Sequence, residues 1–196
     1  MNYLAHFYLA DPEKDLMFGN YIGDGVKGSD LTGYSENVQR GIRFHRFIDS
    51  YTDTHKIVKE AKKLFYPNQR KFSGVVVDVL FDHLLALNWK QHADQELNAF
   101  AKHCYEVIDS HPETLPIRSE RFYGYMVSNN LLEDYGSESG IQRVFIGMDS
   151  RTKFSSNMSS SLEDLNTYRT EFSQMFEQFF PDVIKATGKW KQENGG

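Results

Sequence analysis

Apolar side chains recur every three to four residues along most of this chain, and segments rich in Gly, Pro and Ser interrupt them. Such spacing is typical of amphipathic helices, each of which turns one apolar face toward a core. The pattern predicts helices over the ranges 3–10, 16–26, 35–53, 54–66, 72–92, 95–109, 119–132, 138–148 and 160–179. We therefore predict an all-α fold.

Local signals mark several helix boundaries. Ser35 is the predicted N-cap of the third helix and Thr54 that of the fourth, since such hydroxyls accept hydrogen bonds from a first helical turn. Pro67 lacks a backbone N–H, so the fourth helix is expected to stop before it. The valines that open the range 72–92 favour a strand, but the length of this apolar run favours a buried helix.

Three glycines weaken the helix predicted for 16–26, namely Gly19, Gly23 and Gly25. Each glycine costs up to about 1 kcal/mol inside a helix. We interpret them as positions that close packing or ligand access keeps small.

Composition and charge limit the classes of protein that the chain can belong to. The 196 residues are 40% hydrophobic, which argues against disorder, and no apolar run reaches the roughly 18 residues of a membrane helix. We predict a single irregular helical domain over 1–188 and a disordered tail over 189–196. The net charge of −5 argues against nucleic-acid binding. The lone Cys104 and an N-terminus without a leader pattern lead us to expect a cytoplasmic protein.

Acidic and imidazole groups interrupt two of the most apolar segments. One segment carries His45, Asp49 and Asp53, and the other carries Asp78, Asp82 and His83. Residues four apart share a helix face, and an isolated buried carboxylate is too costly to leave unpaired. Two such helices that face each other would form a metal or acid–base centre.

Neighbouring segments supply further candidates, which are His6, Asn20, Asp24, Arg46 and Arg151. Each has a structural alternative: His6 as a hydrogen-bonded core residue, for example, or Arg46 and Asp49 as a pair within one helix. Imidazole and carboxylate groups without cysteine suit Mn²⁺, Fe²⁺ or Mg²⁺ better than a structural zinc site. Two adjacent ions would suit phosphoester hydrolysis, with Arg46 and Arg151 holding phosphate oxygens.

Basic residues gather in one stretch: Lys56, Lys59, Lys62, Lys63, Arg70 and Lys71. Such a cluster is either a solvated helix face or a docking surface for an acidic partner.

At these residues the chain resembles the acyl carrier protein phosphodiesterases, also called acyl carrier protein hydrolyases. The resemblance runs in order from residue 1 to about residue 180. Its motifs are Met1-Asn2-Tyr3-Leu4-Ala5-His6, Gly19-Asn20 with Asp24, Gly41-Ile42 with His45-Arg46 and Ile48-Asp49, Thr52-Asp53, Asp78, Asp82-His83, and Gly147-Met148 with Ser150-Arg151.

The resemblance implies hydrolysis of the phosphodiester that joins 4′-phosphopantetheine to a serine of holo-acyl carrier protein. The products would be apo-acyl carrier protein and free phosphopantetheine. The family is regarded as an outlying, manganese-dependent branch of the all-helical His-Asp metal phosphohydrolases. Acyl carrier protein is acidic as a class, so Lys56, Lys59, Lys63, Arg70 and Lys71 are the predicted docking residues.

The chain departs from these patterns at a few positions. It has no adjacent His-Asp pair, only the reversed Asp82-His83, so the ligand set of the wider superfamily cannot be copied. Gly25 stands where family members usually carry a bulky residue, and Asp149 and Lys153 replace a small residue and an arginine. These departures concern substrate fit more than metal binding.

We predict that one or two Mn²⁺ ions, with Mg²⁺ or Fe²⁺ as alternatives, are held by His6, Asp24, His45, Asp82 and His83. The predicted catalytic residues are Asp24, Arg46, Asp49, Asp78 and Arg151. Two other functions stay open, a phosphohydrolase of small molecules such as guanosine polyphosphates and a non-catalytic helical binding module. The sequence leaves the oligomeric state open as well.

Overall fold

The structure is a computed structural model that describes residues 1–195, and every regular element in this range is helical. The predicted all-α fold is confirmed. The α-helices are α1 (Tyr3–Ala10), α2 (Lys14–Ile22), α3 (Glu36–Thr54), α4 (Lys56–Gln69), α5 (Ser73–Leu87), α6 (Leu97–Ser110), α7 (Ile117–Ser128), α8 (Leu131–Asp134), α9 (Glu138–Arg151) and α10 (Ser161–Glu193). Short 3-10 turns cover Arg70–Phe72, Trp89–Gln91 and Met158–Ser160.

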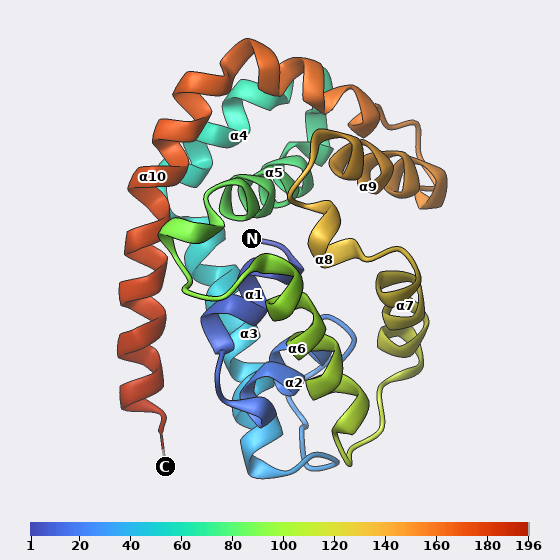
Figure 1. The fold of residues 1–196 in the computed structure, drawn as a ribbon, viewed down its shortest axis with the longest axis vertical. Coiled ribbons are helices and arrows are strands. Elements are labelled where there is room, and N and C mark those ends of the chain that lie inside the picture. The colour runs from blue at the N-terminus through green and yellow to red at the C-terminus, as the bar shows by residue number, and fades with distance from the viewer. Residues whose placement is uncertain (196) are drawn as a thin grey trace.

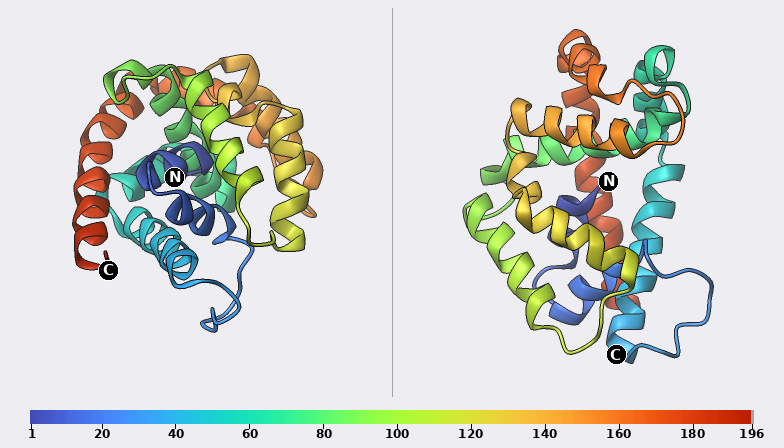
Figure 2. Two further views of the ribbon diagram at one scale, coloured as in Figure 1. Left: turned by 60° about the horizontal axis from the view of Figure 1, so that its bottom comes forward. Right: turned by 90° about the vertical axis from the view of Figure 1, so that its right-hand side faces the viewer.

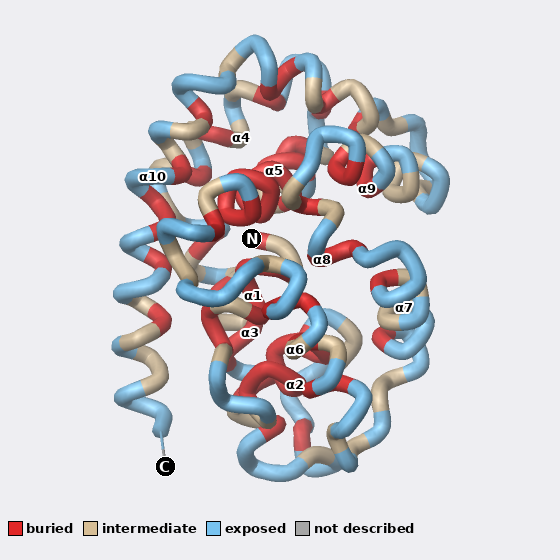
Figure 3. Tube along the Cα trace, viewed as in Figure 1, coloured by how far each residue is buried: buried red, intermediate tan, exposed pale blue. Residues whose placement is uncertain are grey.

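Helix α5 lies in the middle of the molecule, with α10 along one side and α7 and α9 along the other (Figure 1). Val76, Val77 and Val79 are all fully buried, so the apolar run that opens α5 is a core helix rather than a strand. Figure 3 shows that α1, α2 and α5 carry much of the buried surface. No helix among the residues 1–195 is long and apolar enough to span a bilayer.

Aromatic rings join α5 to the long helix α10. The ring of Phe81 stacks on Phe172 at 4.9 Å and on Phe179 at 5.4 Å between centroids, and Phe176 lies 5.7 Å away. Such pairs contribute about 0.5–1.5 kcal/mol each beyond their buried area. The cluster therefore anchors the part of α10 that follows its kink at Tyr168.

Helices α2 and α3 cross in close contact through two glycines. A Cβ atom at Gly19 would lie 2.3 Å from the Val38 oxygen, and one at Gly41 would lie 2.7 Å from Gly19 Cα. Neither position has room for a side chain, which confirms that close packing requires the glycine at position 19. This crossing fixes the position of α2 against the face of α3 that carries His45 and Asp49.

Several predicted boundaries were wrong. His55, not Thr54, caps α4, because the Thr54 hydroxyl donates back to the Ser50 oxygen of its own helix while His55 Nδ1 accepts from Ile57 N–H. Helix α4 continues through Pro67, which is exposed and lies in the last turn. Ser35 is the N-cap of α3, but its side chain makes no capping hydrogen bond.

Further along the chain, the range 119–132 is divided into α7 and α8 at Asn130, where φ is 49°. Helix α9 extends to Arg151, three residues past its predicted end at residue 148. Helix α10 continues to Glu193, well past the expected boundary at residue 188, although residue 196 of the predicted tail lies outside the described part. The segment 23–35 between α2 and α3 is not helical and projects from the helices (Figure 2).

Candidate functional site

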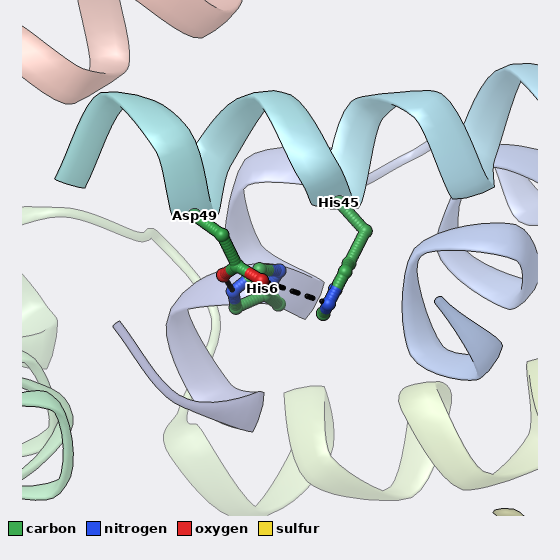
Figure 4. A group of neighbouring side chains, drawn as sticks. All are labelled: His6, His45 and Asp49. Carbon is green, nitrogen blue, oxygen red and sulfur yellow. Dashed lines mark ion pairs between the residues drawn. The ribbon is translucent and has the colours of Figure 1, made fainter. Parts of the chain in front are cut away.

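Two helices bring His6, His45 and Asp49 together, and we call these three residues the His–Asp cluster (Figure 4). His6 comes from α1, while His45 and Asp49 lie four residues apart on one face of α3. The Asp49 carboxylate lies 3.2 Å from His6 Nε2 through one oxygen and 3.1 Å from His45 Nε2 through the other. Their nitrogen and oxygen ligand atoms all lie within 4.8 Å of one another.

Asn20 of α2 orients both imidazoles from behind. Its Oδ1 atom lies 2.7 Å from His6 Nδ1 and 3.3 Å from His45 Nδ1, and its amide nitrogen donates to the His6 backbone oxygen at 2.7 Å. Because an amide oxygen only accepts, both Nδ1 atoms must donate. The two Nε2 atoms are therefore the ones that face Asp49. In metal sites, a hydrogen bond to one imidazole nitrogen orients the other nitrogen toward the ion in the same way.

The His45 imidazole packs directly against the backbone of Gly23. A Cβ atom at this position would lie 2.4 Å from the imidazole ring, so only glycine allows the end of α2 to pass so close to α3. Beyond Gly23 the chain presents Asp24, whose Oδ1 atom lies 3.3 Å from His45 Nε2. Asp24 thus adds a second carboxylate next to the His–Asp cluster.

The charges in this group are strongly coupled. Burial lowers the pKa of His45, but Asp24 and Asp49 offset this effect and raise it to about 9. Burial and the neighbouring His45 hold the pKa of His6 below its usual value. Burial opposes ionisation of Asp49, yet hydrogen bonds with both imidazoles keep the pKa of this carboxyl well below its usual range.

The His–Asp cluster opens into a cleft of about 490 Å³. The histidines are almost buried, whereas the Asp49 and Asp24 side chains are 44% and 66% exposed. With both Nδ1 atoms committed as donors, two Nε2 atoms and two carboxylates converge on a space that solvent reaches. These nitrogen and carboxylate lone pairs repel one another unless a shared proton or a cation lies between them. Imidazole nitrogens and carboxylate oxygens together are ligands that suit a divalent ion of the Mn²⁺, Fe²⁺ or Mg²⁺ class.

Asp82 and His83 lie apart from this group. The buried Asp82 carboxylate accepts hydrogen bonds from the N–H groups of Asn2, Leu4 and Ala5 at 2.8–3.2 Å, so it caps α1. His83 Nδ1 lies 2.6 Å from the Tyr135 backbone oxygen, and His83 does not line the cleft. The structure therefore corrects the predicted ligand set: these two residues do not converge with His6, His45 and Asp24.

Asp78 and Asp53 line the cleft at a distance from the His–Asp cluster. The Asp78 carboxylate forms an ion pair with the amino group of Met1 at 2.7 Å, and Asp53 forms one with Lys62 at 2.7 Å. Burial raises the pKa of Asp78, and the nearby amino group opposes this effect. Both carboxylates that line this part of the cleft are thus engaged in ion pairs.

The two arginines predicted to hold phosphate contact backbone oxygens instead. Arg46 donates to the oxygens of Val26 at 3.2 Å and Gly28 at 2.7 Å, which fastens the projecting segment 23–35 to α3. Arg151 donates to the Gly147 oxygen at 2.9 Å and lies over the ring of Tyr125. Neither residue lines the cleft that holds the His–Asp cluster.

Comparison with known families decides what kind of protein carries this site. A family model described as acyl carrier protein phosphodiesterase matches residues 1–183. The chain belongs to the acyl carrier protein phosphodiesterase family. It is 34% identical to the acyl carrier protein phosphodiesterase of Photorhabdus laumondii over 191 residues, 96% of each chain. It is 34% identical to that of an Enterobacter species over 185 residues and 33% identical to that of Yersinia enterocolitica over 185 residues, in both cases 94% of this chain and 96% of the relative. No solved structure matches the chain.

The predicted docking residues of this family member are all exposed, and we call them the basic surface: Lys56, Lys59, Lys63, Arg70 and Lys71. They lie on α4 and the 3-10 turn that follows it. Lys63 pairs with Glu60 on the same helix at 2.8 Å, whereas Lys71 lies 3.6 Å from the ring centre of the exposed Phe154. The exposed Phe154 side chain, which the sequence reasoning missed, thus lies next to the basic surface.

Sequence reasoning also missed Tyr3 and Arg118, which line the cleft beside the His–Asp cluster. Tyr3 had a signal, since it lies three residues before His6 and so on the same face of α1. Burial and then Asp24 raise its pKa, while Arg118 and Arg151 lower it. No sequence signal marked Arg118, because it is one exposed arginine in a polar segment.

Proposed function

We propose that this protein hydrolyses the phosphodiester between 4′-phosphopantetheine and the serine of holo-acyl carrier protein, with Mn²⁺ as its ion. The observation that carries the proposal is the convergence of His6, His45, Asp49 and Asp24 on one open cleft. Membership in the acyl carrier protein phosphodiesterase family supports the choice of substrate. We place the reaction in the cytoplasm, and the buried, unpaired Cys104 is compatible with a reducing compartment.

His6, His45 and Asp49 would hold the ion, and Asp24 would complete the set. When bound, a divalent ion polarises a phosphoryl oxygen and makes a nucleophile from water at neutral pH. Asn20 keeps both Nε2 atoms directed at this position. Whether one ion binds or two depends on further ligands, for which Asp53 and Asp78 at the rim of the cleft are candidates.

In the proposed reaction, the oxygen of a water molecule forms a bond to phosphorus and the bond from phosphorus to the serine oxygen breaks. Asp24 is ionised at neutral pH, because the hydrogen bond with His45 lowers its pKa. The carboxylate oxygen of Asp24 that does not face His45, Oδ2, can accept the proton that the attacking water loses. The serine oxygen takes up a proton as it leaves, which gives apo-acyl carrier protein and free phosphopantetheine.

The basic surface is the proposed docking site for acyl carrier protein. The side chains of Lys59 and Lys63 project from the exposed face of α4, and α4 follows directly after the helix that carries His45 and Asp49. A positive face next to a reaction site increases the rate of encounter with an acidic partner. The aromatic Phe154 would add an apolar contact at the edge of this face.

Intact-mass spectrometry of holo-acyl carrier protein, incubated with the protein with and without Mn²⁺, tests the proposal. We expect manganese-dependent loss of the phosphopantetheine mass. The Asp49→Asn variant should lose this activity and its bound metal, whereas Asp94→Asn, the same change at an exposed loop position, should retain both. A protein that binds metal and leaves holo-acyl carrier protein intact would contradict the proposed substrate.

A further inference from the structure

A side groove of about 300 Å³ opens next to the cleft of the His–Asp cluster. The two cavities share Tyr3, Tyr21, Asp24 and Arg118. They are therefore neighbouring compartments, and Asp24 and Arg118 stand at their boundary. A volume of this size is at the lower end of the roughly 300–1,000 Å³ that small-molecule sites occupy.

Three helices build the walls of the side groove. The rings of Tyr3 on α1 and Phe122 on α7 stack with centroids 4.6 Å apart, and the Tyr21 hydroxyl of α2 donates to the Ser119 oxygen at 2.8 Å. Contacts between all three helices thus hold the groove in shape. Its lining combines flat aromatic faces with hydroxyl groups, a mixture that suits a slender chain with amide groups.

Gly25 lines the side groove beside Ser119. A Cβ atom at this position would lie 2.3 Å from the Ser119 hydroxyl oxygen, so a side chain here would displace Ser119 or enter the groove. The glycine after Asp24 therefore has a consequence for the shape of the site.

Arg118 is the arginine that both compartments share. Arg46 and Arg151, by contrast, are held against backbone oxygens outside the cleft. The guanidinium of Arg118 is exposed near the start of α7, and its fork of donors matches two oxygens of a phosphate. A phosphate that lies between the His–Asp cluster and Arg118 would sit at the mouth of the side groove.

We propose that Arg118 binds the non-bridging oxygens of the substrate phosphate and that the side groove binds the pantetheine arm attached to it. This inference rests on the proposed function. A phosphodiester has two substituents, and the folded carrier protein is too large to enter a groove of about 300 Å³. The arm is the narrow substituent, so the side groove takes the arm and the carrier protein stays outside.

Calorimetric titration of the Mn²⁺-loaded protein with 4′-phosphopantetheine and with inorganic phosphate tests this assignment. The wild type should bind 4′-phosphopantetheine about tenfold or more tightly than phosphate, since only the former fills the groove. Arg118→Ala should weaken both ligands by a similar factor, about tenfold or more, and Arg118→Lys should restore part of the affinity. Phe122→Ala should weaken 4′-phosphopantetheine alone, because it removes a wall of the groove.

Matched controls lie on the same helix. Arg121→Ala and Ile117→Ala change exposed residues of α7 that line neither cavity, so both variants should bind the two ligands as the wild type does. Circular dichroism checks the fold of each variant, and Phe122→Leu replaces Phe122→Ala if the latter fails to fold. Equal affinity of the wild type for both ligands, or equal losses in the Phe122 variant, would overturn the groove assignment.

The mass-spectrometric assay on the wild type separates this inference from the proposed function. If holo-acyl carrier protein is cleaved but the wild type does not prefer 4′-phosphopantetheine over phosphate, the groove assignment alone is wrong. If holo-acyl carrier protein is not cleaved, the proposed function is wrong, and the titrations then decide by themselves whether the groove binds the arm. Unchanged binding of both ligands by Arg118→Ala would remove the phosphate-binding role of Arg118.

Discussion

The Asn20 side chain holds His6 at two points. Its amide oxygen accepts from the imidazole at 2.7 Å, and its amide nitrogen donates to the backbone oxygen of the same residue at 2.7 Å. A buried residue with both of its polar atoms engaged has little freedom to rotate. The direction of His6 Nε2, and with it the geometry of the His–Asp cluster, is therefore set by the neutral amide of Asn20.

Replacing this amide should weaken metal binding without removing a ligand. We expect Asn20→Ala to lower the affinity for Mn²⁺ by about 10–100-fold, the range typical when an orienting partner of a ligand is lost. Isothermal titration of the metal-free protein measures the effect. Asn129→Ala, which changes an exposed amide at the end of α7, is the control and should bind Mn²⁺ normally. Equal affinity in the Asn20 variant would show that the imidazoles are oriented by packing alone.

Metal binding should depend on pH through His45. In the metal-free protein the pKa of His45 is raised from 6.5 to about 9, so its protonated form stabilises the fold fully below pH 6.5. That contribution disappears as the pH rises to about 9. A metal ion must displace the same proton, so its affinity should increase over this interval.

The thermal shift caused by Mn²⁺ should therefore grow between pH 6.5 and about 9. Melting curves with and without Mn²⁺, recorded without oxygen, measure this shift. In Asp49→Asn, which lacks a carboxylate that raises the pKa of His45, the shift should be small at every pH. A wild-type shift that is the same across this interval would show that the His45 proton is not displaced.

Asp82 should matter for stability rather than for metal ligation. Its carboxylate accepts three backbone N–H groups at the start of α1, and Asp82→Ala would leave them buried without partners. We expect a loss of about 2–4 kcal/mol in the free energy of unfolding. Urea denaturation measures this loss, with Asp94→Ala as an exposed control that should change little.

Metal content distinguishes this role from ligation. The folded Asp82→Ala protein should still bind Mn²⁺ at low temperature, because His6, His45 and Asp49 remain. A variant of unchanged stability that binds no metal would instead make Asp82 a ligand.

Charge reversal on the basic surface should affect encounter with acyl carrier protein. We expect Lys59→Glu combined with Lys63→Glu to raise the KM for holo-acyl carrier protein at low ionic strength and to leave kcat unchanged, because both side chains are exposed. The difference should shrink as salt shortens the Debye length to about 8 Å at 0.15 M. Steady-state kinetics at several salt concentrations measure it.

The control for this experiment reverses two lysines elsewhere, Lys102 on α6 and Lys189 on α10. It introduces the same change in net charge. If both double variants raise the KM equally, total charge is responsible and the basic surface has no special role in docking.

The period of the apolar positions was enough to predict the helical class and most of the elements before α10. It was also enough to place His45 and Asp49 on one face, because that relation depends only on the geometry of a single helix. The same rule places Asp78 and Asp82 on one face of α5. Helix geometry does not predict which segment packs against that face. In the structure, Asp82 accepts hydrogen bonds from the N-terminal turn of α1.

Contacts between distant segments decided the rest. The polar end of α10 carries no strong helical signal, yet Trp190 packs against Phe44 at 4.9 Å between centroids and the helix continues to Glu193. The position of Asn20 behind two imidazoles depends on the close crossing of α2 and α3 at Gly19 and Gly41. The sequence alone thus determined the helices and the residue types available for chemistry. Only tertiary packing decided which of those residues meet, because the faces of separate helices are joined by long-range contacts that no local period contains.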